Sequence, residues 1–222
     1  MDNQNLSSVD SKRRCYLVFL LLFIIGATGV LMFRFWQIKT AGSISFTPQL
    51  SSFILKPPSD ALIGKLILSN GDIKKKPRDK EEFNTFNIGE KILQGERLAT
   101  GKKSKAVVEF SNLVSINLGS DTEIGFNNLI PANLLLRQLS GIVTYELLRD
   151  DAPVSVRSMH ALVTINSGTC AITANQETVT IKVLAGSTTL ALVDLENKTG
   201  VWEIKKGQEA LVDNIQRLVE IK

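Results

Sequence analysis

The sequence predicts an all-β domain of short antiparallel strands, sandwich- or solenoid-like, preceded by one transmembrane α-helix. Two observations support this fold class. A run of nineteen residues without a charge, 15–33, lies near the start of the 222-residue chain. Beyond residue 61, apolar and polar residues alternate with a period of two, as in strands that bury one face, and turn signals recur about every ten residues, as in β-sandwiches and related all-β folds.

Residues 15–36 are predicted to form the membrane helix. The uncharged run would measure about 28 Å as a helix, close to the roughly 30 Å of a bilayer's hydrocarbon core. Three basic residues, 12–14, precede it, and the aromatic residues Tyr16 and Trp36 lie at its two ends. The run exceeds the apolar region of a signal peptide, and no small-residue cleavage site follows it. We therefore expect an uncleaved anchor, which contacts the lipid bilayer.

The remaining boundaries follow from composition. Residues 1–14 form a short polar tail, which the positive-inside rule leaves in the cytoplasm. Residues 37–61 are rich in Ser, Thr and Pro and read as a linker, because Pro57 and Pro58 favour extended backbone. Residues 62–222 form the extracytoplasmic β domain.

Alternation is clearest in three stretches of this domain. Each places three apolar residues on one predicted face: Val179, Ile181 and Val183; Ala106, Val108 and Phe110; Val114, Ile116 and Leu118. Four glycines, Gly64, Gly141, Gly186 and Gly207, each precede a β-forming run, where positive φ is expected. Their spacing is irregular, so it establishes no strict solenoid period.

Composition argues against several function classes. A net charge of +4 and 6% aromatic residues do not suggest a nucleic-acid partner. Two cysteines and one histidine cannot supply a Cys/His zinc site or a disulfide framework.

The stretch Gly95–Phe110, GERLATGKKSKAVVEF, superficially resembles a phosphate-binding loop. A P-loop needs four residues between its glycines and a helix after its Lys-Ser pair. Here five residues separate Gly95 from Gly101, Lys103 interrupts the pair, and a β-type alternation follows. We predict a turn at Gly101–Lys103 between two strands.

No catalytic, cofactor-binding or metal-ligating residue is predicted, and no cofactor. His160 in a strand pattern reads as a surface or half-buried residue, Ser167–Gly168–Thr169 as a tight turn, and Cys170 as a small core residue. Two weaker alternatives stay open. The acidic pairs Asp121 with Glu123 and Asp150 with Asp151 could form a calcium site. Asn197 begins a sequence that matches a glycosylation sequon.

Six pieces of the β region, in order, resemble the FecR-domain family of bacterial extracytoplasmic domains. They are GERLATGKKSKAVVEF, VSINLGSDTEIGF, LSGIVTYEL, ALVTINSGTCAIT, TVTIKVLAGSTTLAL and VWEIKKGQEALV, and together they span roughly residues 62–213. The family's first motif has a glycine, an acidic residue and a Thr-Gly pair in the positions of Gly95, Glu96, Thr100 and Gly101.

Two departures limit what this resemblance implies. Ser111–Val114 stands where the family often has an Asp-Gly-Ser/Thr turn, and the fourteen-residue tail lacks the larger cytoplasmic segment with which signalling members handle a sigma factor. The sigma-regulating role is therefore not carried over. The resemblance implies an all-β, non-catalytic domain for protein or ligand interaction in the bacterial envelope. Together with the predicted anchor, it leads us to expect an inner-membrane protein whose periplasmic domain binds another envelope or inner-membrane protein as a signalling or assembly scaffold.

Two other functions are compatible with the sequence. One helix before an external β domain also describes LptC-type components, which would make the domain a binder or carrier of lipid or glycan with an open apolar interior. A glycan-acting enzyme would need two carboxylates facing a cleft, and nothing in the sequence points to such a pair.

Overall fold

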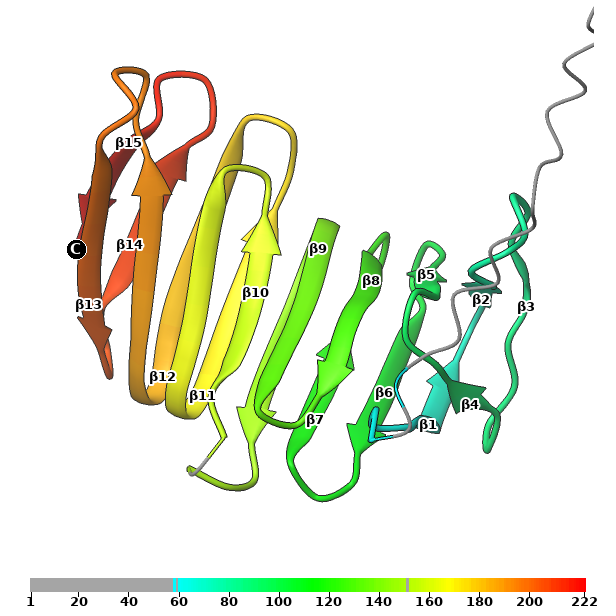
Figure 1. Ribbon diagram of the computed structural model, residues 1–222. Helices are drawn as coiled ribbons and strands as arrows, with labels where there is room; N and C mark the ends of the chain where they lie inside the picture. The colour runs from blue at the N-terminus through cyan, green and yellow to red at the C-terminus, as the bar shows by residue number, and fades with distance from the viewer. Residues whose placement is uncertain (1–57, 59, 151) are drawn as a thin grey trace, which may run out of the picture. The chain divides into compact units, whose positions relative to one another are not determined.

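The computed structural model describes residues 58, 60–150 and 152–222, drawn in colour in Figure 1. These residues belong to the second of two compact units, Leu55–Lys222. Among them, no helix is long and apolar enough to cross a membrane. The predicted membrane helix, residues 15–36, and the linker up to residue 57 lie outside the described residues.

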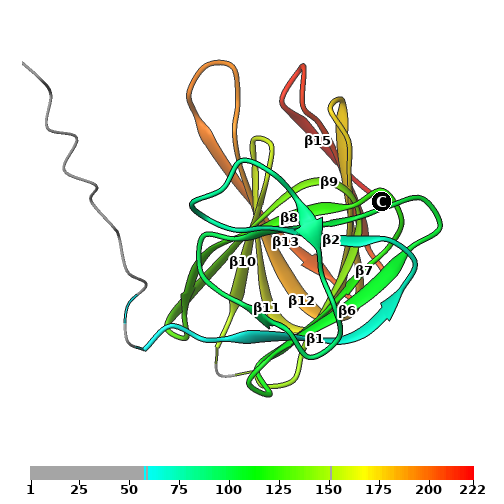
Figure 2. The ribbon, with the colours of Figure 1, turned by 90° about the vertical axis from the view of Figure 1, so that its right-hand side faces the viewer.

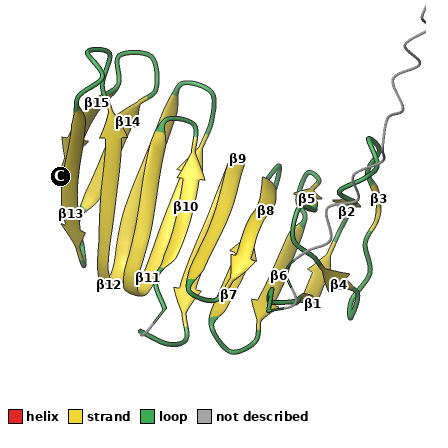
Figure 3. Cartoon of the chain, in the orientation of Figure 1, coloured by secondary structure: helices red, strands yellow, loops and turns green. Residues whose placement is uncertain are grey.

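Fifteen strands and their connecting loops make up the described part, which contains no helix, as Figure 3 shows. The all-β prediction is therefore confirmed for this part of the chain. In chain order the strands are β1 Gly64–Asn70, β2 Ile73–Lys76, β3 Asn84–Thr85, β4 Lys91–Ile92, β5 Arg97–Thr100, β6 Lys105–Phe110, β7 Val114–Leu118, β8 Glu123–Ile130, β9 Asn133–Leu147, β10 Val154–Ser158, β11 Ala161–Ala174, β12 Thr178–Val193, β13 Thr199–Lys205, β14 Glu209–Asp213 and β15 Leu218–Ile221.

The fifteen strands form one hydrogen-bonded sheet, and this sheet folds back on itself at three long strands. β9, β11 and β12 contain 15, 14 and 16 residues, and each has a glycine with positive φ near its middle: Gly141, Gly168 and Gly186. The first half of β9 pairs with β8 and β10, whereas its second half pairs with β7 and β11. Each long strand therefore passes from one layer of the fold to the other at its glycine.

The pairing partners define the two layers. The first contains β3, β2, β5, β8, the first half of β9, β10, the first half of β11, the second half of β12, and β13. The second contains β4, β1, β6, β7, the second halves of β9 and β11, the first half of β12, β14 and β15. Figure 2 shows the strands surrounding a common interior.

Alternating side chains fill the space between the layers. The nine apolar residues predicted to share buried faces, in β6, β7 and β12, are all 2% exposed or less, so this prediction is confirmed. Phe110 of β6 and Phe126 of β8 join the two layers, with ring centroids 5.5 Å apart. Tyr145 is the largest fully buried side chain.

The structure confirms antiparallel pairing for all but one of the strand pairs among the described residues, and it corrects the prediction that the strands are all short. β9, β11 and β12 are long, and β10 runs parallel to β9, with Val154 opposite Leu134. Ser167–Gly168–Thr169 is not a tight turn but the bend inside β11. The local sequence is misleading here because glycine favours both a turn that ends a strand and a bend that lets the strand continue.

The predicted turn at Gly101–Lys103 is confirmed, with Lys103 at φ 58°. The two strands that it joins, β5 and β6, do not pair with each other. β5 pairs with β2 and β8, and β6 pairs with β1 and β7. The turn therefore carries the chain from the first layer to the second.

Candidate protein-interaction edge

Three polar residues of the stretch Gly95–Phe110, Glu96, Thr100 and Ser104, are buried and hold loops in place, whereas Lys102, Lys103 and Lys105 are exposed. The Thr100 hydroxyl donates to the Gly119 carbonyl at 2.6 Å and accepts the Thr122 N–H at 3.0 Å. The Ser104 hydroxyl accepts the Asp72 N–H at 2.9 Å, and the Glu96 carboxylate accepts the Leu93 N–H at 2.8 Å. These bonds give the three buried polar residues a structural role within the fold.

A second set of polar side chains lies in the core beside the strand bends. The Tyr145 hydroxyl donates to Gln138 Oε1 at 3.1 Å, and Gln138 Nε2 donates to the carbonyls of Gly141 and Ile172, at 3.0 Å each. Cys170 is fully buried, which confirms it as a core residue. Burial raises the pKa of its thiol to about 12, and burial also raises the pKa of Tyr145.

The other residues considered from sequence do not come together as a site. His160 is exposed in the turn between β10 and β11, so its predicted place in a strand is wrong. Glu123 pairs with Arg97 at 3.3 Å, and the exposed Asn197 lies in the turn between β12 and β13. Asp150 is exposed, and its neighbour Asp151 lies outside the described residues. No group of three or more His, Cys, Asp or Glu side chains among the described residues could hold a metal ion.

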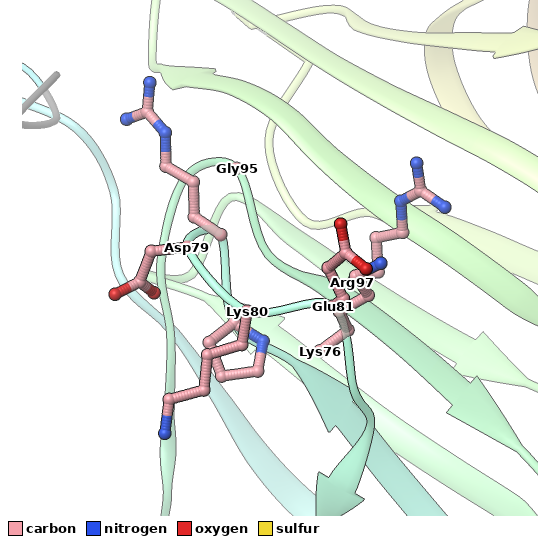
Figure 4. Close-up of a pocket in the computed structure, with 8 residues that line it drawn as sticks. Lys76, Asp79, Lys80, Glu81, Gly95 and Arg97 are labelled. Carbon is pink, nitrogen blue, oxygen red and sulfur yellow. The ribbon is translucent and has the colours of Figure 1, made fainter. Parts of the chain in front are cut away.

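A charged pocket of about 380 Å³ lies where the β2–β3 loop meets the turn before β5. Its lining residues are Lys76, Pro77, Arg78, Asp79, Lys80, Glu81, Gly95 and Arg97. In Figure 4 the labelled charged side chains point in different directions and do not converge on one point. Four of the lining side chains are basic and two, Asp79 and Glu81, are acidic, so carboxylates lie among the basic groups.

One end of the fold is formed by two edge strands, β13 in the first layer and β15 in the second. β13 pairs only with β12, and β15 only with β14, among the described residues. Figure 1 shows both at the same side of the sheet. Trp202 of β13 and Val219 of β15 are partly buried and pack against the core at this end.

Every second residue of β13 directs its backbone N–H and C=O groups away from β12. Lys206 N–H donates to the Gly186 carbonyl and Asp194 N–H donates to the Lys198 carbonyl. Antiparallel pairs alternate between hydrogen-bonded and non-hydrogen-bonded, and the register between these two bonds is unbroken. The even-numbered residues of β13 therefore bond to β12, and the odd-numbered residues direct N–H and C=O outward.

Exposed apolar side chains gather where two hairpins meet at this end. Arg217 of the β14–β15 turn donates to the Asp194 carbonyl of the β12–β13 turn at 3.4 Å, which links the two tips. Beside this bond lie Leu195, Ile215 and Leu218, with exposed fractions of 64%, 69% and 59%. We call these three residues the hairpin-tip cluster.

Sequence reasoning missed this end of the fold. The local signal was present, because Val201, Glu203 and Lys205 alternate with Trp202 and Ile204 in the segment VWEIK. Alternation indicates which side chains are buried, but it does not indicate whether a strand has one neighbour or two.

Comparisons with known proteins support the fold. No protein-family model matches the chain, and no curated protein matches it. Two crystal structures, each described as a proposed anti-sigma factor from Parabacteroides distasonis ATCC 8503, are similar at a TM-score of 0.50, with 15% and 16% identity. The match covers 57% of this chain and 58% of the other, so this chain spans less than two thirds of the solved protein's length. At this identity the likeness shows the fold alone.

Proposed function

We propose that this protein is a single-pass, membrane-anchored bacterial envelope protein whose FecR-like β domain binds another envelope or inner-membrane protein, without catalysing a reaction. In this proposal residues 15–36 anchor it in the inner membrane, and the β domain lies in the periplasm as part of a signalling relay or an assembly scaffold. The observation that carries the proposal is the hairpin-tip cluster. Its side chains are large, apolar and mostly exposed, and the two hairpin tips that carry them are linked by the bond between Arg217 and Asp194.

The physical argument rests on desolvation. Covering apolar surface is worth about 25 cal/mol per Å², and a few well-packed residues near the centre of a contact contribute most of the binding energy in protein interfaces. Ile215 and Leu195 project from turns, where a strand or loop of a partner could reach both. The fold of the two similar crystal structures is compatible with a signalling role and does not by itself assign one.

A lipid or glycan carrier, the second function considered from sequence, would need an apolar interior open to a ligand. Here buried side chains such as Tyr145, Phe110 and Phe126 occupy the space between the layers. This packing favours the protein-interaction proposal over the carrier.

Site-specific photocrosslinking in intact cells tests the proposal. A photoreactive amino acid at Ile215 should capture a distinct partner of defined mass. The matched control is the same probe at Ile88, which is 62% exposed but follows β3 and lies outside the hairpin-tip cluster.

Competition sharpens the result. Leu195→Ser combined with Leu218→Ser should reduce the capture from position 215 at least about tenfold, as expected for losing about 1.4 kcal/mol of binding. Capture of the same species from positions 88 and 215, or capture from 215 that is indifferent to these substitutions, would count against the proposal.

A further inference from the structure

Only a short part of β13 has outward-facing backbone groups without a hydrogen-bond partner among the described residues. Its outward-facing residues are Thr199, Val201, Glu203 and Lys205. Lys205 is already satisfied by the next turn, because its N–H donates to Gln208 Oε1 at 2.8 Å and its carbonyl accepts the Gln208 N–H at 2.9 Å. Three residues, 199, 201 and 203, are therefore left, each with one N–H and one C=O directed away from β12.

These three residues are spaced symmetrically about Val201. A second copy of β13, placed antiparallel with the two Val201 residues opposite each other, brings each Thr199 opposite the partner's Glu203. In hydrogen-bonded antiparallel pairs, the opposed residues exchange both of their N–H···O bonds. Because the three opposed pairs are all of this kind, every outward N–H and C=O of both copies would be satisfied.

The side chains suit the same register. Val201 is 63% exposed, and a β-branched residue suits the pleated surface of a strand. Glu203 would face a threonine hydroxyl rather than a second carboxylate, so the register places no like charges opposite each other. A register shifted by two residues would place Thr199 opposite Lys205, whose backbone is already bonded.

We propose that two copies of this chain associate through β13, as antiparallel edge strands related by a two-fold axis at Val201. The first layers of the two copies then form one continuous sheet. Two-fold self-association needs a surface that is complementary to itself, and the three-residue edge meets this condition. This site is separate from the hairpin-tip cluster, so it goes beyond the proposed binding of a different protein.

Disulfide crosslinking of the full chain in its membranes tests the register. Single cysteines replace Thr199, Val201 or Glu203 in a Cys15→Ser background, and Cys170 is kept because it is buried. Opposed residues in such a pair have Cα atoms about 5.5 Å apart, which is within disulfide range. Under mild oxidation, Val201→Cys should form a covalent dimer.

The flanking positions provide the matched controls. Two Thr199 residues would lie four residues apart along the pair, about 13 Å, and so would two Glu203 residues. Neither single variant should crosslink to itself, but co-expressed Thr199→Cys and Glu203→Cys chains should crosslink to each other. Thermal unfolding of each variant checks that the fold is retained.

Absence of a dimer with Val201→Cys in a folded protein would overturn the proposal. Equal self-crosslinking at all three positions would also overturn it, because random collision would then explain the products. Either result would leave photocrosslinking at Ile215 intact as a test of the partner protein, so the two proposals fail separately.

Discussion

Gly168 of β11 and Gly186 of β12 lie opposite each other in register, and both have positive φ, 76° and 75°. A Cβ on Gly168 would lie 2.4 Å from the Ala185 carbonyl oxygen, and a Cβ on Gly186 would lie 2.2 Å from that of Ser167. Backbone therefore meets backbone at this point, which is where both strands cross between the layers.

Gly168→Ala should destabilise the domain strongly. The substitution adds the strain of positive φ, about 1 kcal/mol or more, to a clash with backbone that cannot rotate away. The matched control is Gly207→Ala, which has φ 84° and nothing within 4 Å of the added Cβ. Thermal unfolding of the full chain in detergent should show a larger loss for Gly168→Ala; equal losses would mean that the close approach at the bend contributes nothing.

Thr100→Val should lower the free energy of unfolding by about 2 kcal/mol. The change keeps the shape of the side chain but removes the hydroxyl that serves the Gly119 carbonyl and the Thr122 N–H. Thr100→Ser, which retains the hydroxyl, should cost less. Denaturant unfolding measures both, and a Ser variant as unstable as the Val variant would contradict the assigned bonds.

Gln138→Leu should be more harmful than Tyr145→Phe. The tyrosine change removes one bond, to Gln138 Oε1, whereas the glutamine change also leaves the carbonyls of Gly141 and Ile172 without their side-chain donor. A buried group left unsatisfied costs about 1–3 kcal/mol. Unfolding of the two single variants and the double variant gives the coupling energy, which should differ from zero because the side chains are in contact.

Stability should fall in alkaline solution, and Cys170 should contribute to the fall. Its pKa is about 12 in the fold, against an ordinary value of 9.0. Between these values the unfolded thiol ionises while the folded thiol keeps its proton, so the unfolded state binds fewer protons. The free energy of unfolding then decreases with pH, by up to about 1.4 kcal/mol per pH unit from this group; below pH 9 the contribution is constant.

Comparing wild type with Cys170→Ala, by denaturant unfolding at about pH 7.5 and about pH 10.5, checks this dependence. The variant should lose less stability between the two conditions. Tyr145 adds to the slope in both proteins, since burial raises its pKa also. An identical loss in the two proteins would contradict the assignment to Cys170.

Backbone N–H groups along β13 alternate between facing outward and bonding to β12, so proline should have different effects at the two kinds of position. Val201 directs its N–H outward, whereas Ile204 directs its N–H to β12. Because proline lacks this donor, it is tolerated where the N–H faces solvent. Val201→Pro should therefore cost less than Ile204→Pro in thermal unfolding, with Ile204→Ala accounting for the lost core side chain. Equal losses would contradict the alternation, and a larger loss for Val201→Pro would show that it runs the opposite way.

Much of the β domain could be predicted from its sequence. Period-two alternation correctly identified Val108, Ile116 and Ile181 as core residues, because the side chains of a strand alternate between its two faces whatever the neighbouring strand is. The turn at Gly101–Lys103 could be predicted for the same reason, since glycine and the β-forming run that follows act locally. The membrane helix at residues 15–36 stays a prediction.

Pairing could not be predicted in this way. β10 lies parallel to β9, and β13 lies at an edge because no second strand among the described residues pairs with it. Local periodicity carries no information on either feature. The bond that links the two hairpin tips likewise joins residues far apart in sequence, because Arg217 reaches Asp194, 23 residues earlier in the chain.

By itself, the sequence determined that the domain is all-β, which side chains it buries, and that Gly95–Phe110 forms strands rather than a phosphate loop. Only the tertiary structure decided that Gly141, Gly168 and Gly186 bend strands instead of ending them. It also decided that three residues of β13 direct their backbone N–H and C=O groups away from β12. The physical reason is that burial follows from side-chain chemistry residue by residue, whereas a strand's neighbours depend on how the whole sheet folds over its core.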